Sequence, residues 1–139
     1  MSNGKNDKKV TGKLKAEIKT SSRSYAFNSQ DVTTNQSGGT FYYQAFHFFW
    51  DPSDLVQVNI SFPETTKAGK YLLNGKSGIY MSFATSSENS LGPYKAVSGE
   101  IDIKEDPTAS TLKAVFEFKG VTPEGKEATI DKGDVSIGA

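Results

Sequence analysis

The sequence predicts an all-β fold, specifically an antiparallel β-sandwich of about nine or ten strands, with a closed or partly open β-barrel as the alternative. Three observations predict it. Apolar residues recur at every second position along most of the chain, aromatic residues make up 12% of it, and turn-forming residues separate the alternating segments. No stretch of ten or more residues repeats its apolar positions with the period of an amphipathic helix. At 139 residues, the chain is long enough for one domain that folds without disulfides.

The first alternating segment predicts a strand over residues 10–19. Leu14 and Ile18 share one face with other apolar or small residues, and mainly lysines occupy the opposite face, as in a strand that buries one side. Two serines end this pattern, and a short second strand is predicted at residues 25–27. The polar residues 28–39 that follow are expected to form a loop.

The most apolar run of the chain predicts a strand over residues 40–50. Residues 51–54, Asp-Pro-Ser-Asp, predict a turn, because proline fixes φ and the Asp and Ser side chains can bond nearby backbone groups. Apolar and polar residues then alternate over residues 56–62. These two segments predict a hairpin.

The middle of the chain predicts two further strands, over residues 70–73 and 79–84. An Asn-Gly pair at positions 74 and 75 lies between them and favours a tight turn, because both residue types tolerate a positive φ. A polar loop is expected over residues 86–93.

The last third shows the clearest alternation. It predicts a meander of three antiparallel strands over residues 97–103, 112–119 and 128–137, separated by proline-containing turns. Gly133 interrupts the third of these segments and is expected to mark a β-bulge.

The charge distribution argues against a nucleic-acid binder. The chain carries 16 basic and 16 acidic residues and has no net charge. Six lysines against two acids give residues 1–19 a net charge of +4, which leaves −4 for the remaining 120 residues. A nucleic-acid-binding domain is expected to carry a basic excess on its folded body.

The sequence also lacks the residues of common catalytic sites, and we expect no enzyme activity, no metal site and no cofactor. There is no cysteine, and His47 is the only histidine, so a multi-histidine metal site is excluded. His47 is expected to be a hydrogen-bonded ring in or beside the core. The acids of the last three strands alternate with lysines in an outward register, which predicts surface ion pairs. Gly-x-Ser-x-Gly and phosphate-binding glycine motifs are absent.

The N-terminal segment indicates where in the cell the protein is located. Residues 1–9 are polar and lysine-rich, and we expect them to form a flexible tether ahead of a single domain over residues 10–139. No run approaches the roughly 20 apolar residues that span a bilayer. A tethered or secreted protein of the cell envelope is predicted, with a cytoplasmic protein as the alternative, and the oligomeric state stays open.

The strand predicted at residues 40–50 is aromatic on both faces. One face would carry Phe41, Tyr43, Ala45, His47 and Phe49. The other would carry Tyr42, Gln44, Phe46, Phe48 and Trp50. Either a loop, formed by residues 28–39 or 86–95, covers the second face, or its rings form an exposed binding platform. In the second case the candidate ligand-binding residues are Tyr42, Phe46, Phe48 and Trp50.

Several segments carry a family resemblance. Residues 99–103, 112–118, 125–130 and 133–135 follow a pattern of the form G-x-I-x-I, F-x-F and G-K-x-x-x-I, and residues 62–71 contain P-x-x-x-x-A-G-x-Y. Together they resemble small bacterial β-sandwich lipoproteins of unknown function from the envelopes of Bacteroidetes-type bacteria. The resemblance covers residues 60–137 loosely and implies an envelope-tethered domain without catalytic residues.

These observations lead to one functional prediction and two alternatives. We expect a non-catalytic binding or adhesion-type domain that recognises a glycan or a protein through the aromatic face. One alternative is a lipocalin-like carrier that encloses an apolar small molecule. The other is an interaction protein, such as an inhibitor, an immunity protein or a toxin-associated subunit.

Overall fold

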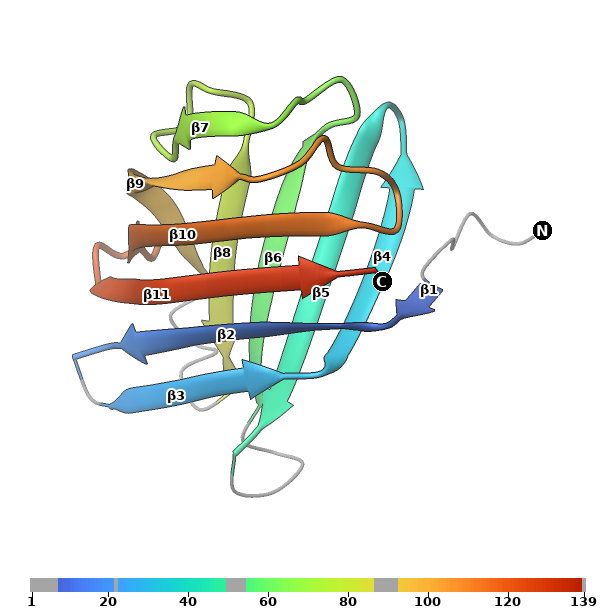
Figure 1. The fold of residues 1–139 in the computed structure, drawn as a ribbon. Helices are drawn as coiled ribbons and strands as arrows, with labels where there is room; N and C mark the ends of the chain where they lie inside the picture. Colours follow the sequence, from blue (N-terminus) through green and yellow to red (C-terminus); the bar gives the residue numbers. More distant parts are fainter. Residues whose placement is uncertain (1–7, 22, 50–54, 87–92, 139) are drawn as a thin grey trace.

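The computed structural model describes residues 8–21, 23–49, 55–86 and 93–138. In this part of the chain, antiparallel strands form one continuous, strongly curved sheet (Figure 1). Its strand order is β1-β4-β5-β6-β8-β9-β10-β11-β2-β3, and β7 pairs with β9 beside this path. The strands are β1 (Lys8–Val10), β2 (Gly12–Lys19), β3 (Ser24–Ser29), β4 (Asp31–Ser37), β5 (Thr40–Phe48), β6 (Leu55–Pro63), β7 (Gly69–Leu72), β8 (Tyr80–Thr85), β9 (Tyr94–Ile103), β10 (Leu112–Val121) and β11 (Glu127–Ile137).

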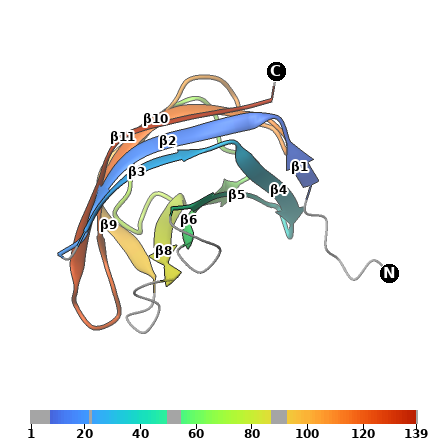
Figure 2. The same cartoon turned by 90° about the horizontal axis from the view of Figure 1, so that it is seen from below.

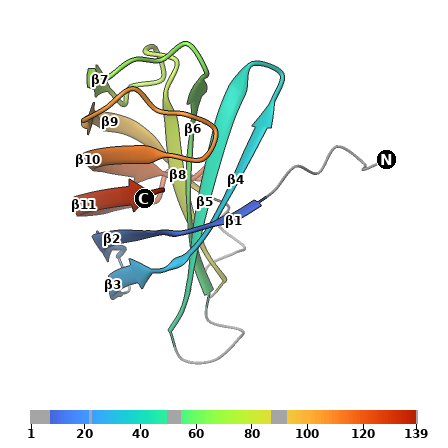
Figure 3. The same ribbon diagram turned by 45° about the vertical axis from the view of Figure 1, so that its right-hand side comes forward.

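The sheet folds over on itself into two layers. β4, β5, β6 and β8 form one layer, and β2, β3, β10, β11 and most of β9 form the other, which crosses over the first (Figures 2 and 3). β9 joins the layers, because it pairs with β8 at Tyr94 and Lys95 and with β10 along most of its length. β9 bends where Val97 is the extra residue of a bulge and where Gly99 adopts a φ of 124°.

The predicted all-β antiparallel fold is confirmed, and the alternative architecture, a partly open barrel, fits the structure better than the predicted β-sandwich. A sandwich needs two separate sheets, whereas hydrogen-bonded pairing here continues through the whole strand order. The alternation of apolar residues shows which face of a strand is buried. It does not show whether neighbouring strands bend from one layer into the next, so it could not separate the two architectures.

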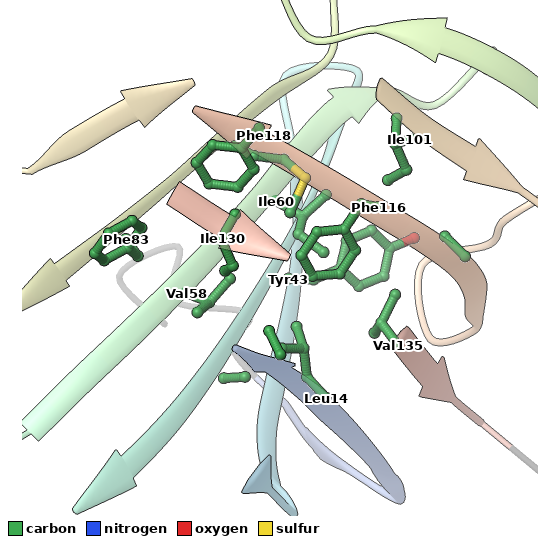
Figure 4. Close-up of a cluster of buried hydrophobic side chains, with 14 of the residues drawn as sticks. Leu14, Tyr43, Val58, Ile60, Phe83, Ile101, Phe116, Phe118, Ile130 and Val135 are labelled. Atoms are coloured by element: carbon green, nitrogen blue, oxygen red, sulfur yellow. The ribbon is translucent and has the colours of Figure 1, made fainter. Parts of the chain in front are cut away.

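The interior of the barrel is filled by side chains from both layers (Figure 4). The ring of Phe83 on β8 stacks on Tyr94 with 4.8 Å between centroids, and it lies 6.3 Å from the ring of Phe118 on β10. The hydroxyl of Tyr43 on β5 donates a hydrogen bond of 2.6 Å to the backbone carbonyl of Thr108, which lies in the connection between β9 and β10. Rings and one buried hydrogen bond thus tie the layers together.

The hairpin and the meander predicted from the sequence are confirmed. β5 pairs with β6 from Thr40 to Phe48, and β9, β10 and β11 are consecutive antiparallel neighbours. The predicted bulge at Gly133 is also present, as register shifts on both sides of β11. A Cβ atom at Gly133 would lie 2.3 Å from the ring of Phe116, so glycine is required there by the ring that packs against it.

Two expectations about the N-terminal part of the chain need correction. Residues 31–37, predicted to be part of a loop, form β4, because Val32 and Thr34 alternate inward although only one of them is apolar. Lys8 and Lys9, assigned to the tether, pair with Thr34 and Thr33 in β1. Residues 1–7 lie outside the described residues. Within the described residues, no helix is long and apolar enough to cross a membrane.

Candidate functional site

The structure decides which face of β5 points inward. Phe41, Tyr43 and Ala45 are buried in the core, whereas Tyr42 is 41% exposed and Phe48 52% exposed. Phe46, in the same outward register, is half-buried. Three of the four predicted site residues therefore share the outer face of β5. Trp50, the fourth, lies outside the described residues.

Residues 28–39, one of the two segments predicted to cover this face, enlarge it instead, and residues 87–92 of the other segment lie outside the described residues. Residues 31–37 pair with β5 as strand β4 and contribute outward side chains of their own. On the other side of β5, β6 and β8 continue the same layer. The outer face of β4, β5, β6 and β8 is thus a four-stranded surface, which we call the binding face.

One row of side chains across the binding face combines rings and polar groups. The row crosses four strands. Asn35 on β4 pairs with Tyr42 on β5. Tyr42 pairs in turn with Ser61 on β6, and Ser61 pairs with Tyr80 on β8. Tyr80 is 57% exposed. We call these four residues the ring row. Three strand spacings give it a length of about 14 Å.

A second row lies directly beside the ring row and contains only amides and hydroxyls. Thr33, Gln44, Asn59 and Ser82 are successive register partners on β4, β5, β6 and β8, and we call them the amide row. Asn59 Nδ2 donates to Ser82 Oγ over 3.4 Å, and Asn59 Oδ1 accepts a hydrogen bond of 2.8 Å from Gln57 Nε2. These bonds hold the Asn59 amide in one orientation.

A hollow of about 280 Å³ adjoins one end of the ring row. Its lining is polar apart from the ring of Tyr42, and it includes Asn35 and Gln44. Asn35 Oδ1 is buried and has no hydrogen-bond partner among the described residues. A buried acceptor without a donor is costly for the free protein.

The binding face is almost free of charge. Among the outward positions of β4, β5, β6 and β8, only Asp31, at the start of β4, is charged at neutral pH. Lys95 on β9, the exposed register partner of Ser82, borders this face. The outer face of β2, β9, β10 and β11 is the opposite. It carries Lys13, Lys15, Glu17, Lys19, Glu100, Asp102, Lys113, Glu117, Lys119, Glu127, Asp131 and Asp134. The two outer surfaces of one barrel therefore have different chemistries, and the uncharged one is the candidate site.

The charged face has a larger hollow, of about 620 Å³, lined by acids that include Glu17, Glu100, Glu117 and Asp131. The register places Glu100 opposite Glu117 and Glu17 opposite Asp131. Ion pairs of 3.1 Å and 3.5 Å join Lys119 to Glu127 and Lys132 to Glu17. No group of three or more His, Asp or Glu residues is arranged to hold a metal ion in the part of the chain that the structure describes.

His47 lies away from the binding face, at the seam between β5 and β3. Its ring is half-buried, stacks on Phe49 at 3.9 Å and meets the edge of Phe27 at 5.7 Å. Its Nδ1 accepts the backbone N–H of Asn28, and burial lowers its pKa. The prediction of a hydrogen-bonded ring beside the core agrees with this position.

Comparison with known proteins adds no assignment. Neither a scan against protein-family models nor searches of curated proteins and of solved structures found a match for this chain. The resemblance to bacterial envelope lipoproteins stays a prediction from the sequence.

Sequence reasoning found the rings of β5 and missed their partners. Asn35 and Tyr80 lie 7 residues before and 38 residues after Tyr42 in the chain, and only the strand order brings them into one row. The sequence did contain a signal for this uncharged face. The polar positions of residues 56–62 are the uncharged Gln57, Asn59 and Ser61, whereas the polar positions of the last strands are mainly Lys, Glu and Asp.

Proposed function

We propose that this protein is a non-catalytic module that binds a neutral glycan on the binding face. The observation that carries the proposal is the pairing of two neighbouring rows, one with exposed tyrosines and one with amides and hydroxyls, on a surface almost free of charge.

The chemistry of the two rows matches that of a sugar. A pyranose has apolar C–H faces that pack on aromatic rings and a rim of hydroxyls that donate and accept hydrogen bonds. Tyr42 and Tyr80 offer exposed rings with polar tips. Gln44 and Asn59 offer both donors and acceptors in each amide. A neutral sugar meets no buried charge that it would have to desolvate.

The barrel interior favours surface binding over a lipocalin-like carrier. Core rings from both layers fill the interior, and those of Phe83 and Phe118 lie 6.3 Å apart inside the barrel (Figure 4). A carrier needs an enclosed apolar cavity of several hundred Å³. The hollow beside the ring row and the hollow on the charged face are both open, and mainly polar or charged residues line them.

Affinity electrophoresis tests the proposal. The protein is run through native gels that contain xyloglucan, galactomannan, hydroxyethylcellulose, laminarin or dextran, and through gels with polygalacturonate or heparin as charged comparators. We expect retardation by at least one neutral polymer and loss of that retardation in Tyr42→Ala. Val115→Ala, which removes a side chain that is 40% exposed on the charged face, is the matched control. Retardation by charged polymers alone, or by none of the polymers, would contradict the proposal.

A further inference from the structure

We infer that the binding face takes an extended, β-1,4-linked chain of neutral hexoses, which lies across the strands along the ring row and places one sugar unit in the hollow beside Asn35. The inference rests on the proposed function and adds the linkage class, the direction of the bound chain and the role of Asn35.

The spacing of the two exposed tyrosines sets the direction. Tyr42 and Tyr80 are both register partners of Ser61, on its two sides, so two strand spacings separate them, about 10 Å. That distance is close to the repeat of two β-1,4-linked hexoses, in which alternate units present equivalent faces. One chain can therefore stack on both rings while the unit between them lies over the hydroxyl of Ser61.

Asn35 extends the same row beyond Tyr42. Asn35 lines the hollow that Tyr42 also lines. Its Oδ1 is buried in the free protein and lacks a hydrogen-bond partner among the described residues. A chain that stacks on Tyr80 and Tyr42 continues toward this hollow. When the Asn35 side chain rotates so that Oδ1 faces the hollow, a hydroxyl of the next unit can donate to it, which relieves the cost of leaving this acceptor unpaired.

The amide row supports the same direction. Gln44, Asn59 and Ser82 run parallel to the ring row, two residues away along each strand. A chain along the ring row would keep one edge of each sugar beside these groups. A chain that instead ran along β5, from Tyr42 past Gln44 to Phe46 and Phe48, would cross the amide row once and reach neither Tyr80 nor Asn35.

Isothermal titration calorimetry with cellotriose, cellohexaose and mannohexaose tests the inference. We expect at least one hexasaccharide to bind and the trisaccharide to bind more weakly than the hexasaccharide of its series. Tyr80→Ala should weaken binding of that hexasaccharide at least tenfold. Val115→Ala, on the charged face, should change the affinity less than twofold. Phe48→Ala, which removes an exposed ring outside the ring row, should weaken binding less than Tyr80→Ala does.

Asn35→Val supplies a readout that a structural role would not give. It should weaken hexasaccharide binding about tenfold, because one hydrogen bond is lost. In the free protein it should leave the urea unfolding midpoint unchanged or raised, because it removes an unpaired buried acceptor. A lowered midpoint together with unchanged affinity would overturn the role of Asn35.

The remaining outcomes separate this inference from the proposed function. If Phe48→Ala weakens binding and Tyr80→Ala does not, the direction is overturned while glycan binding stands. If the hexasaccharides fail to bind and laminarin or dextran retards the protein, the linkage class is overturned and the proposed function stands. If no neutral glycan binds, both are overturned.

Discussion

The backbone N–H of Asn28 donates a hydrogen bond of 3.0 Å to Nδ1 of His47, and this bond joins β3 to β5 at the seam of the barrel. The flanking rings of Phe27 and Phe49 partly shield the imidazole from water. Only the neutral imidazole can accept at Nδ1. The seam therefore depends on the protonation state of His47.

We predict that the seam weakens in mild acid. Burial lowers the pKa of His47 in the folded protein, so between its unfolded and folded pKa values the unfolded state binds more protons. The contribution of His47 to stability is then complete above its ordinary pKa of about 6.5 and is lost as the pH falls through the folded value. Urea unfolding at pH 7.5, 6.5 and 5.5 should show the midpoint falling.

His47→Gln is the control for that measurement, because a glutamine side chain can accept a hydrogen bond but does not titrate. We expect its unfolding midpoint to change less than that of the wild type over the same pH range. An equal pH dependence in both proteins would assign the effect to other groups.

The bulge at Gly133 should tolerate no side chain while Phe116 is present. Gly133→Ala places a Cβ against the ring, at 2.3 Å before relaxation, and overpacking of this kind costs about 1–3 kcal/mol. Phe116→Leu should relieve the clash, so the double variant should lose less stability than the two single variants predict together. Additive losses in a denaturant-unfolding cycle would show that the ring is not what requires glycine.

The Tyr43 hydroxyl should stabilise the barrel by joining its layers. It donates to the Thr108 carbonyl, and burial raises the pKa of this phenol well above its usual value. Tyr43→Phe should cost about 1 kcal/mol of unfolding free energy. Tyr42→Phe, one residue away on the exposed face, should stay within about 0.5 kcal/mol. Equal losses in thermal or urea unfolding would contradict this account.

Truncating an aromatic side chain in the core should cost much more unfolding free energy than truncating one on the outer face of β5. Phe83 is fully buried, and Phe83→Ala should cost about 3–5 kcal/mol. Phe48 is 52% exposed, and Phe48→Ala should cost at most about 1 kcal/mol. If Phe48→Ala destabilises the protein as much as Phe83→Ala in urea unfolding, the outer face of β5 is covered.

The sequence predicted the segments whose apolar alternation is strong and whose pairing is local. The meander over residues 97–137 and the hairpin of β5 and β6 follow from that pattern, because a short connection leaves few other partners. β4 escaped prediction because Val32 is its only apolar inward residue, and the inward Thr34 reads as polar. Burial of Thr34 depends on the neighbouring β1 and β5, which the pattern within β4 does not record.

Only the part of the candidate site that lies within one strand could be predicted from the sequence. The outward register of β5 follows from period two, which grouped Tyr42, Phe46 and Phe48 correctly on one face. Whether that face is inside or outside depends on the curvature of the sheet. The rows across it depend on long-range pairing, such as that of Ser61 with Tyr80. Such pairing depends on the whole sheet and cannot be read from any single segment.

Chemical-shift mapping is the measurement that tests glycan binding at this face most directly. ¹⁵N-labelled protein is titrated with a hexasaccharide of the neutral polymer that retards it in affinity electrophoresis. We predict that the perturbed amides concentrate in β4, β5, β6 and β8 and include Asn35, Tyr42 and Tyr80. Perturbations centred on β2, β10 and β11, or spread through the core, would contradict the account, because the sugar would then bind the charged face or the barrel interior.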